Sequence, residues 1–88
     1  MLFDLGSVVA TPRCLRHCVK NNIDPMHLIQ RHAAGDWGDL GTDDIDSNIH
    51  AVQHDLRIFS SYIVGEGKVW CITEADRSST CLLLPSEY

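Results

Sequence analysis

A glycine-punctuated loop brings together residue types that could recognise a partner molecule. It reads Gly35-Asp36-Trp37-Gly38-Asp39 and places one large aromatic ring between two carboxylates. Loops of this kind often carry function, and tryptophan dominates the energetically important positions of protein interfaces. We therefore predict that Asp36, Trp37 and Asp39 contact a partner protein. The alternative is that Trp37 folds back and fills a gap in a small core.

A second polar cluster lies between two predicted strands near the end of the chain. Two acids, a base and three hydroxyls fall close together there and could hold a phosphate or a carboxylate. Aspartate and serine also form turns by bonding nearby amides, so ordinary turn chemistry is the alternative. The residues are Glu74, Asp76, Arg77, Ser78, Ser79 and Thr80. We predict that the segment from Asp76 to Thr80 belongs to the same partner-binding surface.

An enzymatic interpretation uses four of the chain's residues: Arg57, Tyr62, Glu74 and Arg77. Small bacterial ribonucleases such as barnase place an acid, a base and an arginine on an antiparallel sheet that follows helices. This is an analogy of fold alone. Such enzymes are usually basic, whereas this chain is acidic and has no histidine in its predicted sheet. A small ribonuclease-like toxin using Glu74 and Arg77 is kept as the alternative function.

Two helical groups have side chains that could bind a metal ion. Core packing is the preferred explanation of the first group, because free cysteine is among the most buried residue types. A solvated polar face explains the second, and a structural zinc also needs a fourth ligand. We therefore predict no metal and no cofactor, with a metal-binding regulator as a further alternative. The groups are Cys14, His17 and Cys18, and Asp46, His50 and His54.

Charge is distributed unevenly along the 88 residues, whose net charge is −5. Residues 1–34 carry +2, residues 35–55 carry −6 and residues 56–88 carry −1. Phosphate contacts dominate nucleic-acid affinity, so an acidic chain without a basic cluster is not expected to bind nucleic acid directly. The acidic stretch could instead imitate phosphates and occupy a nucleic-acid-binding protein of the host.

Length and composition place the chain among small folded domains. A chain of this size buries only about 60–65% of its unfolded surface, so a homodimer could contribute to its stability. The sequence has no basic, apolar leader and no apolar run long enough to span a membrane. We therefore predict a cytoplasmic address, where the four cysteines stay reduced.

Helices are predicted in the first two thirds of the chain. Thr11-Pro12 and Asp24-Pro25 are both helix starts, for helices running to about Lys20 and Ala34. Thr42 is the predicted cap of a third helix. The apolar stripe of that helix, with a spacing of 4, 3 and 4 residues, is expected to face the core. It consists of Ile45, Ile49, Val52 and Leu56.

Strands are predicted after Leu56, where the hydrophobic spacing changes from helical to β-like. They cover residues 58–64, 68–73 and 80–84, with short turns between them. Such consecutive strands predict an antiparallel meander. The expected fold is a single α+β domain, residues 1–88, with three N-terminal helices packed on a C-terminal three-stranded antiparallel meander. Residues 2–10 could form a short strand or an extended packing segment.

Four segments together resemble a family of small, poorly characterised bacterial proteins encoded mainly on plasmids and other mobile elements. They are residues 3–12, 35–40, 72–80 and 83–88. The family is sometimes labelled as a restriction-modification subunit. The chain nevertheless lacks the catalytic motif of a methyltransferase, Asn or Asp followed by Pro-Pro and an aromatic residue. The resemblance implies a bacterial, mobile-element setting and supplies no catalytic residues.

These observations lead to one expected function. The chain is predicted to be a non-enzymatic accessory protein of bacterial mobile elements. It would bind a host or element-encoded protein through the loop at Asp36–Asp39 and the turn at Asp76–Thr80.

Overall fold

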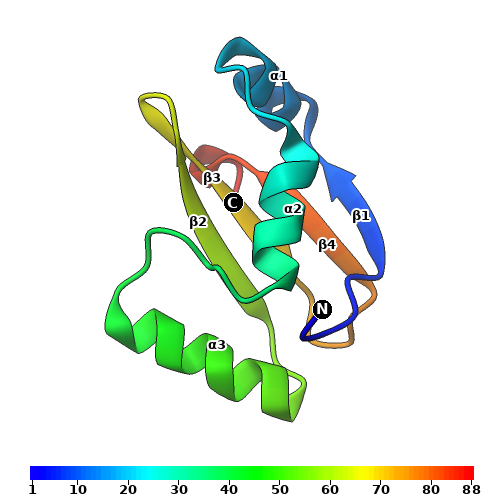
Figure 1. Ribbon diagram of the computed structural model, residues 1–88. Coiled ribbons are helices and arrows are strands. Elements are labelled where there is room, and N and C mark those ends of the chain that lie inside the picture. Colours follow the sequence, from blue (N-terminus) through cyan, green and yellow to red (C-terminus); the bar gives the residue numbers. More distant parts are fainter.

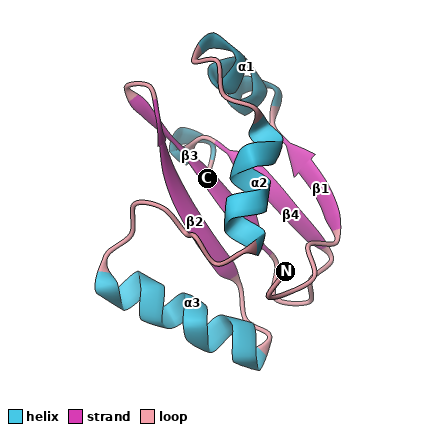
Figure 2. Ribbon diagram, viewed as in Figure 1, coloured by secondary structure: helices cyan, strands magenta, loops and turns pink.

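Three α-helices, one short 3-10 helix and four strands make up the chain, whose computed structural model describes residues 1–88 (Figures 1 and 2). None of the helices has the length and apolar character needed to span a bilayer. The strands are β1 (Ser7–Ala10), β2 (Ile58–Val64), β3 (Gly67–Thr73) and β4 (Ser79–Leu83). The helices are α1 (Pro12–Lys20), α2 (Pro25–Ala33), α3 (Thr42–His54) and the short 3-10 helix η1 (Pro85–Glu87).

Local signals in the sequence account for where the helices begin. The Thr11 hydroxyl accepts the amide of Cys14 at 3.1 Å at the start of α1, and the Asp24 carboxylate accepts the amide of Met26 at 2.9 Å at the start of α2. Both predicted caps are therefore confirmed. The third is wrong by one residue, because Gly41 is the N-cap of α3 and Thr42 is its first helical residue.

The sheet has four strands in the order β1-β4-β3-β2, so the prediction of a three-stranded antiparallel meander is wrong. The pairs β2–β3 and β3–β4 are antiparallel, as predicted. The N-terminal segment adds the fourth strand, β1, which runs parallel to β4. Figure 1 shows these two strands, far apart in the sequence, lying side by side at one edge. The result is a mixed sheet.

Contacts just before β1 explain why the N-terminal segment joins the sheet. The Thr80 hydroxyl donates to the carbonyl of Leu5 at 2.7 Å, and the Ser7 amide donates to the carbonyl of Ser78 at 3.0 Å. Gly6 lies between them with a φ of +64°, and a Cβ there would stand 2.4 Å from two carbonyl oxygens of the 77–78 turn. Only glycine allows this approach. Such a pairing between the two ends of the chain leaves no local signal in the sequence.

The two faces of the sheet are covered differently. Alternation along the strands directs Ile58, Tyr62, Val69, Cys71 and Leu82 towards the helices, where all five are buried. Helix α2 crosses this face in Figure 1, and α1 sits at its upper end. Buried side chains of these two helices complete the main core: Cys14, Cys18, Leu28 and Ile29. No α-helix packs over the opposite face.

Helix α3 meets the sheet through a polar residue, which corrects a second prediction. Its expected core-facing stripe is largely exposed, with Ile49 at 47%. Asn48 and Ala51 are the buried residues of this helix instead. The Asn48 amide accepts the Phe59 N–H at 3.0 Å and donates to the Phe59 carbonyl at 2.6 Å. Since an edge strand offers backbone groups rather than an apolar surface, a polar side chain of α3 faces it.

A buried chain of hydrogen bonds crosses the covered side of the sheet. His32 of α2 lies between Ser60 and Thr73, and Thr73 contacts Thr80 at 2.7 Å. Because the single hydrogen of Thr80 goes to Leu5, Thr73 must donate to Thr80, and His32 Nε2 must donate to Thr73. Burial disfavours the charged imidazolium and lowers the pKa of His32 to about 4. In the neutral ring with its hydrogen on Nε2, Nδ1 is an acceptor for the Ser60 hydroxyl.

Acid should destabilise the fold through His32. Between its ordinary pKa of 6.5 and about 4, the unfolded chain takes up a proton there and the folded chain does not. The free energy of unfolding should therefore fall as the pH drops through this window, by about 3 kcal/mol. Urea denaturation at a series of pH values measures this slope.

His32→Gln should remove this part of the slope, whereas His27→Gln, on the exposed side of the same helix, should keep it. An NMR titration of the wild-type imidazoles provides a check that does not depend on the variants folding. A His32 ring that titrates near 6.5 would contradict the assignment.

Candidate functional site

The uncovered side of the sheet combines an aromatic surface with an arginine–glutamate pair. We call it the open face. It is formed by residues of β2, β3 and β4, by the residues directly before β2 and after β3, and by Tyr88. Its members are Arg57, Phe59, Trp70, Ile72, Glu74, Ser79, Cys81, Leu83 and Tyr88. They line two adjoining hollows of about 190 and 240 Å³, with Arg57, Ile72 and Tyr88 shared by both.

Three aromatic rings stack edge to face across this surface. The Phe59 and Trp70 centroids are 5.0 Å apart, and those of Trp70 and Tyr88 are 5.6 Å apart. Helix η1 brings Tyr88 there, and Glu87 fixes η1 by accepting the Leu84 amide at 2.8 Å and the Thr11 hydroxyl at 2.7 Å. These hydrogen bonds hold the pKa of the Glu87 carboxyl below its ordinary value. The same carboxylate thus ties the end of the chain to the start of α1.

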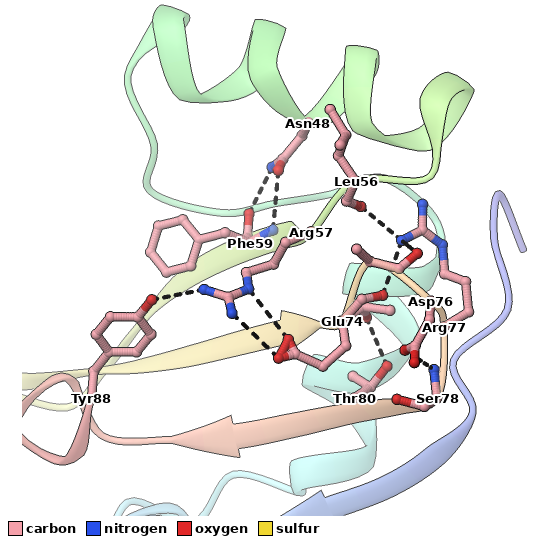
Figure 3. A network of polar contacts seen from close by, with 12 residues as sticks. Asn48, Leu56, Arg57, Phe59, Glu74, Asp76, Arg77, Ser78, Thr80 and Tyr88 are labelled. Carbon is pink, nitrogen blue, oxygen red and sulfur yellow. Dashed lines mark hydrogen bonds and ion pairs between the residues drawn. The ribbon is translucent and has the colours of Figure 1, made fainter.

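Arg57 stands between an acid and a phenol on the open face (Figure 3). Its Nε lies 3.2 Å from Glu74 Oε2, and one terminal nitrogen donates to the Tyr88 hydroxyl at 2.9 Å. Both members of the ion pair are partly exposed. Because a guanidinium has five N–H donors, Arg57 keeps some for another molecule. The arrangement offers charge-assisted hydrogen bonds beside apolar hollows, which suits a peptide or protein surface.

The predicted contact loop turns out to be bound closely to the fold. The Asp36 carboxylate accepts from Arg31 Nε at 2.7 Å, which holds the pKa of Asp36 below its ordinary value. The Tyr62 hydroxyl donates to the Asp36 carbonyl at 2.7 Å, and the Arg31 guanidinium stacks 4.5 Å above the Tyr62 ring. The Asp39 carboxylate lies 3.1 Å from Lys68 Nζ. Both carboxylates are thus neutralised within the chain.

Trp37 is a core residue with only 8% of its surface exposed. It packs in a second small core with Phe3, Ala51 and Ile58, where its indole Nε1 has no hydrogen-bond partner. Its carbonyl accepts the Ser61 amide at 3.1 Å, so the loop also covers the edge of β2. The alternative in which Trp37 fills a small core describes its position. Little of the ring is left for a partner.

The predicted polar turn is likewise used mainly to connect elements of the fold (Figure 3). The Asp76 carboxylate accepts the Ser78 amide at 2.9 Å, and hydrogen bonds from Ser78 hold the pKa of Asp76 below its ordinary value. Arg77 donates to the carbonyl of Leu56 at 2.7 Å and to that of Ala51 at 2.9 Å. Thr80 belongs to the buried chain. Ser79 is half-buried at the edge of the open face.

The residues of the ribonuclease interpretation do not converge on one site. Arg57 and Glu74 are paired on the open face. Tyr62 is buried on the opposite, helix-covered face, where burial raises the pKa of its hydroxyl. The Arg77 guanidinium is occupied by backbone carbonyls. Acid, base and transition-state donor are therefore not arranged around a common point.

No group of three or more His, Cys, Asp or Glu side chains is placed to hold a metal ion. Cys14 and Cys18 are buried in the main core, and burial raises the pKa of the Cys14 thiol to about 12. The His17 ring instead contacts the Val64 carbonyl at 2.8 Å. His50 and His54 stack on each other, with their ring centroids 4.2 Å apart.

Comparisons with protein families, with curated proteins and with solved structures found no match for this chain.

Sequence reasoning identified Arg57 and Glu74 but missed the surface around them. The signal was present in β3 and β4. Residues 69–72 and 81–84 are apolar at every position rather than at every second one. Uninterrupted apolar strands have two apolar faces, and only one of these faces is covered by helices here.

Replacing Arg77 by lysine should weaken the attachment of the last turn of α3 to the turn between β3 and β4. The side chain is only 12% exposed, and an ammonium cannot span the carbonyls of Ala51 and Leu56 together. Hydrogen bonds to charged groups contribute roughly 1.5–3 kcal/mol each, so Arg77→Lys should lower the free energy of unfolding by about 2 kcal/mol. Lysine keeps the positive charge. The left-handed backbone at residue 77, with a φ of +61°, is as unfavourable for lysine as for arginine, so the substitution changes only the side-chain hydrogen bonds.

Urea denaturation measures this loss, and hydrogen exchange should quicken most in the last turn of α3. The matched control is Arg16→Lys on the exposed side of α1, which should change stability by less than about 0.5 kcal/mol. Equal losses in the two variants would contradict the anchoring role.

Proposed function

We propose that this chain is a non-enzymatic binding module that takes a segment of another protein on its open face. The observation that carries the proposal is the Arg57–Glu74–Tyr88 cluster, which lies beside the partly exposed rings of Phe59 and Trp70. Tyrosine, tryptophan and arginine are the residues enriched at the energetic centres of protein interfaces. The resemblance to proteins of mobile elements suggests that the partner is encoded by the host or by the element.

The open face supports this role better than the acidic stretch at residues 35–55. Asp36 and Asp39 are bound to Arg31 and Lys68, and Asp55 lies 4.0 Å from Arg77. Only Asp43, Asp44 and Asp46 on α3 remain as unpaired carboxylates of that stretch. Three charges on one helix are a small surface for imitating a run of phosphates. The expected partner therefore presents an apolar side chain for the hollows and an acceptor group for Arg57.

Affinity capture with matched variants tests the proposal. Immobilised wild-type protein is incubated with lysate of a bacterial host, and bound proteins are quantified by mass spectrometry. The Kd of the recovered partner is then measured with purified proteins. Arg57→Ala and Tyr88→Ala should each weaken binding tenfold or more, since truncating an interface centre costs about 2 kcal/mol.

Val19→Ala is the control, because Val19 is 75% exposed on α1, away from the open face. Circular dichroism verifies that all variants fold. Unchanged binding after both open-face substitutions would contradict the proposal. RNA cleavage that is lost in Glu74→Ala would replace it with a nuclease activity.

A further inference from the structure

One edge of the sheet, at β2, is covered by other parts of the chain, whereas the other edge, at β1, is open. At the β2 edge, Asn48 binds both backbone groups of Phe59, and the loop at Trp37–Asp39 binds both groups of Ser61. At the β1 edge, β4 is the only neighbour, and Figure 1 shows no segment along the outer side of β1. A strand can therefore be added to this sheet at β1 alone.

Backbone groups on the outer side of β1 are available for such an addition. The amides of Ser7 and Thr11 donate to carbonyls of Ser78 and Leu82. Since backbone groups alternate in direction along a strand, those of Val8 and Ala10 point away from the sheet. The side chain of Val9 is 49% exposed and lies beside Cys81, on the side of the open face.

We propose that the outer edge of β1 pairs antiparallel with the β1 edge of a second copy of this chain. A twofold axis perpendicular to the sheet would pass between the two copies of Val9. Val8 of each copy would then exchange both hydrogen bonds with Ala10 of the other. This register keeps the helix-covered faces of both copies on one side, and it joins their open faces into one surface over eight strands.

Charges at the two ends of β1 favour a second copy as the occupant. Asp4 and Asp76 line an open hollow together with Val8 near the start of the strand, and the one basic residue there, Arg77, is bound to backbone carbonyls. Arg13 and Arg16 are exposed on α1, just beyond its end. Antiparallel pairing brings the start of one strand beside the end of the other, so acidic and basic groups would meet at both ends. The thin stability margin of a chain of this size is consistent with such an assembly.

The mass in solution tests this dimer by light scattering or sedimentation over a wide range of concentration. Wild-type protein should pass from 9.8 kDa to twice that mass. Val9→Lys should raise the dimer dissociation constant tenfold or more, because it places like charges directly opposite each other. An equimolar mixture of Val9→Lys and Val9→Glu should restore the dimer. Val19→Lys, the same substitution at an exposed site of α1, should leave the dimer intact.

Hydrogen exchange of the wild-type protein gives a second measurement that needs no variant. The amides of Val8 and Ala10 should become protected as the concentration rises. A chain that stays at 9.8 kDa with these amides unprotected would overturn the proposal, as would a dimer that Val9→Lys does not weaken. The role of the open face is tested separately, since Arg57→Ala should leave this dimer unchanged.

Discussion

The buried hydrogen-bond chain from Ser60 through His32, Thr73 and Thr80 to the carbonyl of Leu5 is the interaction on which the architecture depends. It joins α2, the strands β2, β3 and β4, and the segment that leads into β1. Each hydroxyl has one hydrogen to donate, so the hydrogen bond from Thr80 to Leu5 fixes the direction of the bonds back to His32. Removing any member would leave a buried polar group without a partner, which is costly in a low-dielectric interior. This requirement brings the N-terminal segment to the sheet.

That arrangement determines what remains available on the surface. Helices α1 and α2 cover the face that contains the polar chain, while α3 and the loop at Trp37 close the edge of β2. With three short helices used in this way, the opposite face has only η1 and Tyr88 over it. The way the helices pack therefore leaves both the open face and the β1 edge accessible. The two surfaces adjoin each other at Val9 and Cys81.

Polar side chains hold several elements of this small domain together. Asn48 acts as a partner for the edge of β2, and Arg77 binds carbonyls at the end of α3. Arg31 neutralises Asp36 while stacking on Tyr62. In each case one polar side chain joins two elements of the fold. This explains why residues that looked suited to binding a partner, such as Asp36 and Arg77, are engaged inside the molecule.

The sequence alone determined the features that depend on neighbouring residues. Thr11 and Asp24 mark helix starts because a cap and its amide lie two or three positions apart, and the β-branched and aromatic residues after Leu56 mark strands. Tertiary structure decided the rest: the pairing of β1 with β4, the exposure of Ile49 in place of Asn48, and the open face around Arg57. The physical reason is that the spacing of residues along the chain determines which side chains share a face of a helix or strand. Which face is buried, and against which backbone groups, depends on partners tens of residues away in the chain.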